Sequence, residues 1–182
     1  MHEMTAANLR SAFAGESMAR MRYLIWAAQA EADGFPNTAR LFRAISAAEE
    51  VHATGHFNAM RDLQGPALVV AGGGFGLGST SENLQAAIDG ENFEVEEMYP
   101  AYLAEAQRQE ERGAERSFRY ALEAERIHAA MYAKAKQAVD AGSDVELGPV
   151  QICSVCGHTV EGDAPESCPV CGARKERFTS FL

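Results

Sequence analysis

The sequence predicts an all-α bundle of four helices, followed by a small C-terminal metal domain of short strands and turns. Two observations lead to this prediction. Apolar residues recur at helical spacing from residue 5 to about residue 141, and all four cysteines lie within the last 30 residues. A chain of 182 residues with 47% hydrophobic residues is also long and apolar enough to bury a core. We place the domain boundary in a polar hinge, which gives domains 1–145 and 146–182.

The apolar stripes predict four amphipathic helices, near residues 5–32, 38–63, 81–108 and 114–140. Helix-breaking residues separate the members of each pair, with Gly34 and Pro36 in the first turn and Gly113 in the second. Ser79 and Glu82 have the spacing of a capping box at the start of the third helix. Short turns of this kind make the two helices of each pair antiparallel neighbours.

A longer stretch, residues 63–80, joins the two helix pairs. Two short turns and one long crossover are the connectivity of a ferritin-like bundle. The glycine-rich run Gly72–Gly78 lacks the spacing of a phosphate-binding loop, so we interpret it as a flexible part of the crossover. Pro100 lies inside the third predicted helix and removes a backbone donor, which predicts a kink or bulge just past Glu94.

An internal repeat relates the two helix pairs. A shift of 76 residues places Glu49-x-x-His52 on Glu125-x-x-His128, whereas Glu16 falls on Glu91 with a shift of 75. The bundle is therefore interpreted as two copies of one helix pair that differ by a single inserted residue.

Several acidic and imidazole side chains lie on the apolar faces of the predicted helices. Burying ionised carboxylates without partners costs several kcal/mol each, so positive charge should lie between them. One Glu from each of two helices, plus Glu-x-x-His from each of the other two, is the ligand set of a di-metal carboxylate bundle. Solvated surface charges are the alternative, but that arrangement would remove the hydrophobic seam of the helices. The candidate metal ligands are Glu16, Glu49, His52, Glu91, Glu94, Glu125 and His128.

Three further side chains lie near these candidates in the sequence. Tyr23 and Tyr99 are placed to hydrogen-bond a ligand carboxylate, although both could equally be core aromatics. His56 lies one turn beyond His52, and we favour a role other than metal ligand for it.

The cysteines form two Cys-x-x-Cys-Gly knuckles. Four thiolates at this spacing suit a tetrahedral iron or zinc ion, and the pattern alone does not choose between the two metals. A redox-active di-metal bundle in the same chain favours iron. The four ligands are Cys153, Cys156, Cys168 and Cys171.

Together these features resemble the rubrerythrin family over nearly the full length of the chain. The resemblance rests on Ala14–Ser17, the two Glu-x-x-His motifs, Gly90–Glu94, Glu97–Pro100 and the two rubredoxin-like knuckles. One departure is His158, which follows the first knuckle where rubredoxins commonly carry tyrosine. The glycine-rich crossover is a second departure.

The resemblance implies a ferritin-like bundle holding two iron ions and a rubredoxin-like domain holding one. It implies a non-haem peroxidase that reduces hydrogen peroxide to water, with electrons relayed through the four-cysteine iron. His52 and Glu94 would exchange at one iron between redox states, and Tyr23 and Tyr99 would donate to the ligands. It also implies a homodimer in which the four-cysteine site of one subunit lies close to the di-iron site of the other.

The net charge of the chain and the motifs that it lacks limit the kinds of partner that it is expected to bind. The formal charge of −10 and the absence of a basic stripe argue against nucleic acid or an anionic membrane. No secretion signal or membrane-spanning stretch is visible, so a cytoplasmic protein is expected. No nucleotide motif is present, so rubredoxin or a separate NAD(P)H-dependent reductase is the expected electron donor.

Two other functions use some of the same residues. A ferritin-like ferroxidase or iron-storage protein would need the bundle ligands, but it has no need of a one-electron relay in a four-cysteine tail. A binding module with a structural zinc ribbon would need the cysteines, but it leaves the buried carboxylates unexplained.

Overall fold

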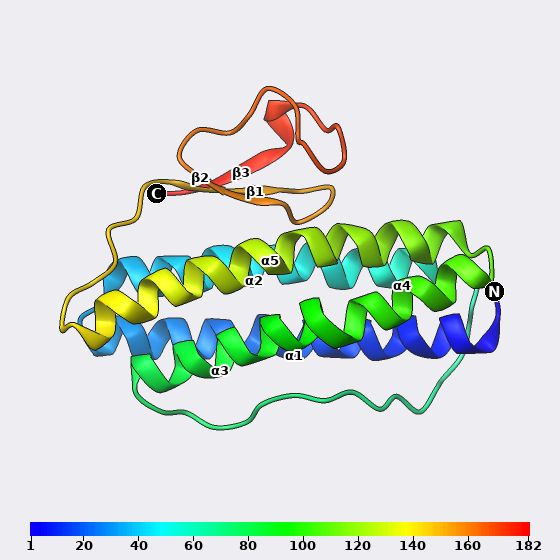
Figure 1. The fold of residues 1–182 in the computed structure, drawn as a ribbon, viewed down its shortest axis with the longest axis horizontal. Helices are drawn as coiled ribbons and strands as arrows, with labels where there is room; N and C mark the ends of the chain where they lie inside the picture. Colours follow the sequence, from blue (N-terminus) through cyan, green and yellow to red (C-terminus); the bar gives the residue numbers. More distant parts are fainter.

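The computed structural model describes residues 1–182 and confirms the all-α ferritin-like bundle with a small C-terminal domain (Figure 1). The α-helices are α1 (Glu3–Ala32), α2 (Pro36–Ala59), α3 (Thr80–Phe93), α4 (Tyr99–Arg108) and α5 (Arg112–Asp140). A π-helical turn, η1 (Glu94–Met98), joins α3 to α4, so these three elements together form the third rod of the bundle. The crossover between α2 and α3 runs along one side of the bundle (Figure 1). None of the helices is both long and apolar enough to cross a membrane.

The bundle core consists of two apolar clusters separated along its length. Tyr23, Phe42 and Tyr132 belong to the cluster near one end, where neighbouring aromatic rings lie 5.1–5.9 Å apart. Tyr99 and Phe118 belong to the other cluster. Along every rod, the acidic and imidazole side chains predicted to bind metal lie between the residues of one cluster and those of the other. A polar layer therefore crosses the middle of an otherwise apolar core.

The π-helical turn confirms the irregularity predicted past Glu94. Pro100 has no backbone N–H, and the N–H of Tyr99 bonds the carbonyl of Glu94, five residues earlier. The turn also accounts for the inserted residue in the repeat. Glu16 matches Glu91 at a shift of 75, whereas Tyr23 matches Tyr99 at a shift of 76. The extra residue therefore lies between Glu91 and Tyr99, where the π-helical turn is found. The extra residue turns the side chain of Tyr99 into the core, where it is 0% exposed.

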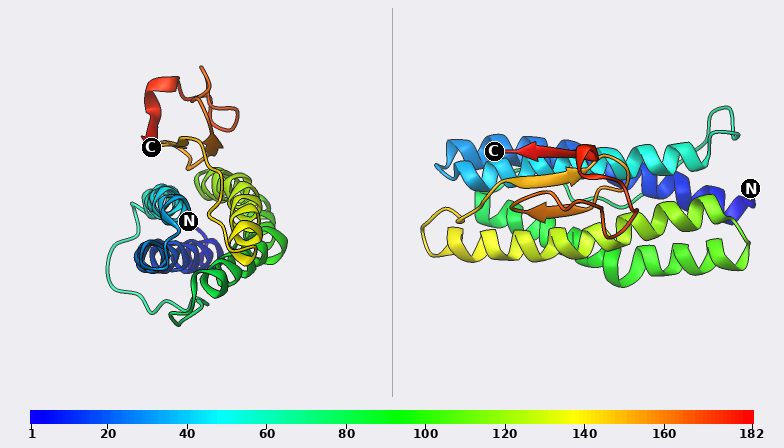
Figure 2. Two further views of the ribbon diagram at one scale, coloured as in Figure 1. Left: turned by 90° about the vertical axis from the view of Figure 1, so that its left-hand side faces the viewer. Right: turned by 90° about the horizontal axis from the view of Figure 1, so that it is seen from above.

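The C-terminal domain contains a three-stranded antiparallel sheet in the order β2-β1-β3. Its strands are β1 (Val150–Cys153), β2 (Thr159–Glu161) and β3 (Phe178–Phe181), with a short 3-10 helix, η2 (Lys175–Arg177), before β3. The sheet lies over α2 and α5, as the two views of Figure 2 show. Val150 and Ile152 of β1 bury their side chains against Ala44 and Ala48 of α2. Small residues on α2 thus allow the sheet to pack closely on the bundle.

The linker after α5 is tied to the start of α2. The carboxylate of Asp144 accepts hydrogen bonds from the backbone N–H of Asn37 at 2.6 Å and of Thr38 at 3.1 Å. These N–H groups belong to the first helical turn and have no acceptor within the helix. Arg40 donates to the carbonyl of Leu147 at 2.6 Å. The polar hinge is therefore held to the bundle, which fixes the position from which the C-terminal domain starts.

Replacing Asp144 with alanine should lower the free energy of unfolding by about 1 kcal/mol, because the first turn of α2 loses its acceptor. Urea unfolding followed by circular dichroism measures this change. Asp163→Ala, in an exposed turn of the C-terminal domain, is the matched control and should shift stability by less than about 0.5 kcal/mol. Equal midpoints for the two variants would contradict the capping role of Asp144.

Candidate metal centres

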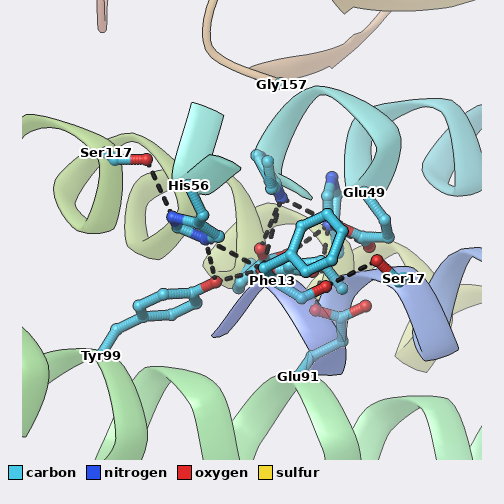
Figure 3. A network of polar contacts seen from close by, with 12 residues as sticks. Phe13, Ser17, Glu49, His56, Glu91, Tyr99, Ser117 and Gly157 are labelled. Carbon is cyan, nitrogen blue, oxygen red and sulfur yellow. Dashed lines mark hydrogen bonds and ion pairs between the residues drawn. The ribbon is translucent and has the colours of Figure 1, made fainter. Parts of the chain in front are cut away.

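Each rod of the bundle places one glutamate in the polar layer. Glu16 comes from α1, Glu49 from α2, Glu91 from α3 and Glu125 from α5, and none is more than 1% exposed. Each sits on a helix face that is otherwise apolar, so the packing that forms the bundle also forces the carboxylates inward. Figure 3 shows Glu49 and Glu91 approaching from opposite sides of this layer.

The side chains form two overlapping four-residue sets, and within each set one ligand atom per residue lies within 4.8 Å of the others. The first set is Glu16, Glu49, His52 and Glu125. The second set is Glu49, Glu91, Glu125 and His128. Glu49 and Glu125 belong to both sets, so these two carboxylates would help to hold each of two metal ions.

Both histidines direct the Nδ1 atom toward the carboxylates. The Nδ1 atom of His52 lies 2.8 Å from Glu49 and 2.8 Å from Glu125. The Nδ1 atom of His128 lies 2.7 Å from Glu125 and 3.4 Å from Glu49. The Glu-x-x-His spacing produces this geometry because residues three apart lie on one face of a helix. Each imidazole therefore offers Nδ1 to a metal and keeps Nε2 on the far side.

The electrostatics of this layer fit two bound cations. One oxygen each of Glu16, Glu49 and Glu91 is buried without a hydrogen-bond partner. Burial, followed by the charges of neighbouring glutamates, raises the pKa of Glu16 and Glu91 well above the usual range. No lysine or arginine forms an ion pair with these carboxylates. Two divalent ions would supply the missing positive charge and use the unpaired oxygens.

The positive charge of His52 and His128 offsets only part of the negative charge of the glutamates. Burial acts to raise the pKa of Glu125, but the adjacent His52 and His128 outweigh burial and hold that pKa below the usual range. Burial acts against a charged imidazole, yet Glu49 and Glu125 together raise the pKa of His128 to about 9. Two imidazoles cannot neutralise the remaining acids of the layer.

Glu94 lies beside these sets but belongs to neither. It sits at the start of the π-helical turn, and burial and then the charges of Glu125 and Glu49 raise its pKa well above the usual range. It also lines a cavity of ≈ 500 Å³ between α1, the crossover and the third rod, together with Arg22. The predicted role of Glu94 as a ligand therefore stays a prediction, and the cavity gives its side chain space to move.

Two tyrosines donate hydrogen bonds to the carboxylates. Tyr23 donates to Glu91 at 2.6 Å, and Tyr99 donates to Glu16. Burial and the adjacent glutamates raise the pKa of both phenols well above 10, so both tyrosines are neutral hydrogen-bond donors. Each tyrosine thereby fixes the orientation of one glutamate.

The four cysteines form a compact cluster at one end of the sheet. They are free thiols whose Sγ atoms lie within 4.8 Å of one another, and the Sγ atoms of Cys153 and Cys171 are 3.6 Å apart. Gly157 and Gly172 follow the knuckles with φ of 77° and 75°, a conformation that favours glycine. Hydrogen bonds from the Cys156 thiol and from nearby backbone N–H groups lower the pKa of Cys153 to about 5. The close spacing of the four Sγ atoms suits one tetrahedral metal ion.

The two centres meet at the imidazole rings. The Nε2 atom of His128 lies 2.8 Å from the hydroxyl of Thr159, and that hydroxyl donates to the carbonyl of Gly157 at 3.0 Å. Gly157 itself packs against the ring of His52, where an added Cβ atom would lie 2.0 Å from Nε2. Only glycine fits at this position. The bundle centre and the first cysteine knuckle are therefore in direct contact through protein atoms.

The expected approach between subunits, in which the four-cysteine site of one subunit lies close to the di-iron site of the other, stays a prediction. Here the approach is made within one chain, because the linker tied to α2 folds the C-terminal domain back over α2 and α5. Thr159 is a partner of His128 that was not predicted from the sequence. No sequence signal marks it, because the contact depends on how the sheet packs on the bundle.

His56 belongs to neither ligand set. It is fully buried, with Nε2 3.0 Å from the Tyr99 hydroxyl and Nδ1 2.8 Å from the Ser117 hydroxyl (Figure 3). Burial lowers the pKa of His56 to about 3, so the imidazole is neutral. Ser117 carried no signal in the sequence analysis.

Comparison with known proteins agrees with this architecture. The chain matches the rubrerythrin family over residues 7–136 and the rubredoxin-like domain of rubrerythrin over residues 151–179. It is 49% identical to rubrerythrin-2 of Clostridium acetobutylicum, over 98% of this chain and 97% of that protein. It is 33% identical to rubrerythrin of Nitratidesulfovibrio vulgaris, over 96% of this chain and 92% of that protein.

Solved structures show the same fold. Fully reduced, all-ferrous nigerythrin has a TM-score of 0.85 and 32% sequence identity, over 97% of this chain and 86% of that chain. A bacterioferritin of Mycobacterium tuberculosis shares the fold, with a TM-score of 0.69 at 17% identity over 79% of this chain and 90% of that chain. The chain therefore belongs to the rubrerythrin family, with a di-iron carboxylate centre in its bundle and a four-cysteine iron centre in its C-terminal domain.

Proposed function

We propose that this protein is a peroxidase that reduces hydrogen peroxide to two molecules of water. The observation that carries this proposal is the direct contact of the four-cysteine domain with His52 and His128 of the bundle centre. A four-cysteine iron transfers one electron at a time, so it suits a position next to a di-iron centre that needs two electrons to be reduced. An iron-storage protein has no need of such a neighbour.

Glu49 and Glu125 occur in both overlapping sets, so both would contribute to holding each iron. We assign Glu94 and His52 as the pair that exchanges at one iron, because Glu94 sits on the π-helical turn beside a cavity. The formal charge of five glutamates and two irons changes only from about −1 to about +1 in a two-electron cycle. The ligand set is Glu16, Glu49, His52, Glu91, Glu94, Glu125 and His128, with Cys153, Cys156, Cys168 and Cys171 around the third iron.

The protein prepares the site for this reaction in three ways. The two apolar clusters on either side of the polar layer exclude bulk water from it. Tyr23 and Tyr99 hold Glu91 and Glu16 in fixed orientations. When bound, two ferrous ions supply both electrons needed to cleave the O–O bond.

The four-cysteine iron of the C-terminal domain would supply the returning electrons. Thr159 and Gly157 connect the first knuckle to the imidazole of His128 by hydrogen bonds of 3.0 and 2.8 Å. We propose rubredoxin or an NAD(P)H-dependent reductase as the external donor, with a basic surface that complements the charge of −10. The four free cysteines suit a reducing compartment such as the cytoplasm, and we propose a homodimer as the working assembly.

Mixing the diferrous protein with each oxidant in a stopped-flow instrument tests the reaction. Hydrogen peroxide should oxidise the di-iron centre at least about tenfold faster than oxygen does at equal concentration, because the site is built for two-electron O–O cleavage. Faster oxidation by oxygen, accompanied by growth of an iron mineral, would favour the ferroxidase or iron-storage alternative and contradict the proposal.

Replacing Glu125 with alanine should remove at least one iron from the bundle, because this carboxylate belongs to both ligand sets. Metal analysis should therefore fall from about three irons per chain to about two or fewer. Glu123→Ala, a partly exposed glutamate on the same helix, is the matched control and should retain all the iron. The absorption of the ferric four-cysteine centre reports that the C-terminal domain is intact in both variants. Full iron content in Glu125→Ala would refute the ligand assignment.

A further inference from the structure

A buried line of hydrogen bonds leads from the bundle centre toward the surface. It starts at Glu16, passes through the hydroxyl of Tyr99 and both ring nitrogens of His56, and ends at the hydroxyl of Ser117 (Figure 3). The His56–Tyr99 and Ser117–His56 contacts measure 3.0 and 2.8 Å. Every neighbouring pair is within hydrogen-bond distance, so the line has no gap.

The hydrogen bonds along this line all point in one direction. Tyr99 donates its only proton to the carboxylate of Glu16, so its oxygen can only accept from His56. The Nε2 atom of His56 must then carry the ring proton, which leaves Nδ1 as an acceptor for the hydroxyl of Ser117. The direction runs from Ser117 inward to Glu16.

The outer end of the line is open to solvent. Ser117 lines a groove of ≈ 530 Å³ between α2, α5 and the C-terminal domain, together with Gly55, Tyr120 and Val155. Gly55 leaves space at this point, because an added Cβ atom would lie 3.1 Å from the Ser117 hydroxyl. Water in the groove can therefore reach the Ser117 hydroxyl, whereas His56 and Tyr99 are 0% exposed.

The internal repeat supplies a comparison within the same molecule. Tyr23 is the counterpart of Tyr99, and Tyr132 stands at the position that corresponds to His56. The hydroxyl of Tyr132 is buried without a partner among aromatic rings, so no polar path continues from Tyr23 to the surface. Tyr99 already has an acceptor in Glu16 and needs no imidazole to satisfy its proton. Packing alone therefore gives no reason to bury a polar ring at His56.

We propose that Ser117, His56 and Tyr99 form a relay that carries protons from the groove to the Glu16 edge of the bundle centre. This relay rests on the proposed peroxidase function, because H2O2 + 2 e− + 2 H+ yields two H2O and the electrons come from the irons. A proton from groove water enters at Ser117, whose own proton passes to Nδ1 of His56. The Nε2 proton passes to Tyr99, and the phenolic proton of Tyr99 passes to Glu16. One passage leaves the ring proton of His56 on Nδ1. Before the second proton of each peroxide can pass, the His56 side chain must reorient about both of its torsions, so that the protonated nitrogen again faces Tyr99.

Two substitutions at Ser117 test the relay by its effect on the reaction. Ser117→Ala should slow peroxide oxidation of the diferrous protein by about tenfold or more and change its solvent isotope effect, because the entry hydroxyl is lost. Ser117→Thr keeps the hydroxyl and should restore most of the rate. Tyr132→Phe, which removes the corresponding hydroxyl of the other half, should react like the wild type.

The direction of the line has its own test, which does not depend on catalysis. In protein loaded with diamagnetic zinc, nitrogen NMR should show His56 as the neutral tautomer with its proton on Nε2. A proton on Nδ1 would overturn the relay. Equal peroxide rates for the wild type and Ser117→Ala would also overturn the relay and leave the proposed function standing. A wild-type protein that does not react with peroxide would overturn both.

Discussion

The structure depends on one electrostatic constraint, which is that four carboxylates lie in the middle of an apolar helical core. None of these glutamates is more than 1% exposed, and no lysine or arginine pairs with them. An arrangement of this kind is unfavourable unless cations or protons occupy it. The surrounding features follow from that requirement: two histidines aim Nδ1 inward, and two tyrosines donate to the outer oxygens. Apolar clusters on either side then keep water out.

The same imidazoles join the two domains. Because Nδ1 faces the carboxylates, Nε2 of each ring faces the C-terminal sheet, where Thr159 bonds one ring and Gly157 packs on the other. Asp144 and the small side chains of α2 hold the sheet in that position. A side chain on Gly157, or a displaced linker, would separate the centres without altering a single ligand. The arrangement of the linker thus sets how close the two centres lie, on which the proposed electron transfer depends.

Much of this molecule could be predicted from its sequence. The helical spacing and the repeated Glu-x-x-His motif place the ligands on inward faces, because helix geometry alone decides which residues share a face. Pro100 predicts a kink or bulge past Glu94, since it lacks a backbone donor, and a π-helical turn is found there. The contacts of Thr159, Gly157 and Ser117 could not be predicted, because they depend on how one element packs against another distant in the sequence. His56 was visible on its helix, but its burial and its partners became clear only in three dimensions.

The most direct measurement of the central claim is the pH dependence of stability with and without metal. Raised pKa values of Glu16, Glu91 and His128 mean that the metal-free folded chain holds protons that the unfolded chain has released. Urea unfolding of chelated protein, followed by the helical circular dichroism signal, should therefore show stability falling from about pH 5 to about pH 9. Metal-loaded protein should show the opposite slope, because cations replace those protons and bind better as pH rises. Parallel pH profiles for the two forms would contradict the account.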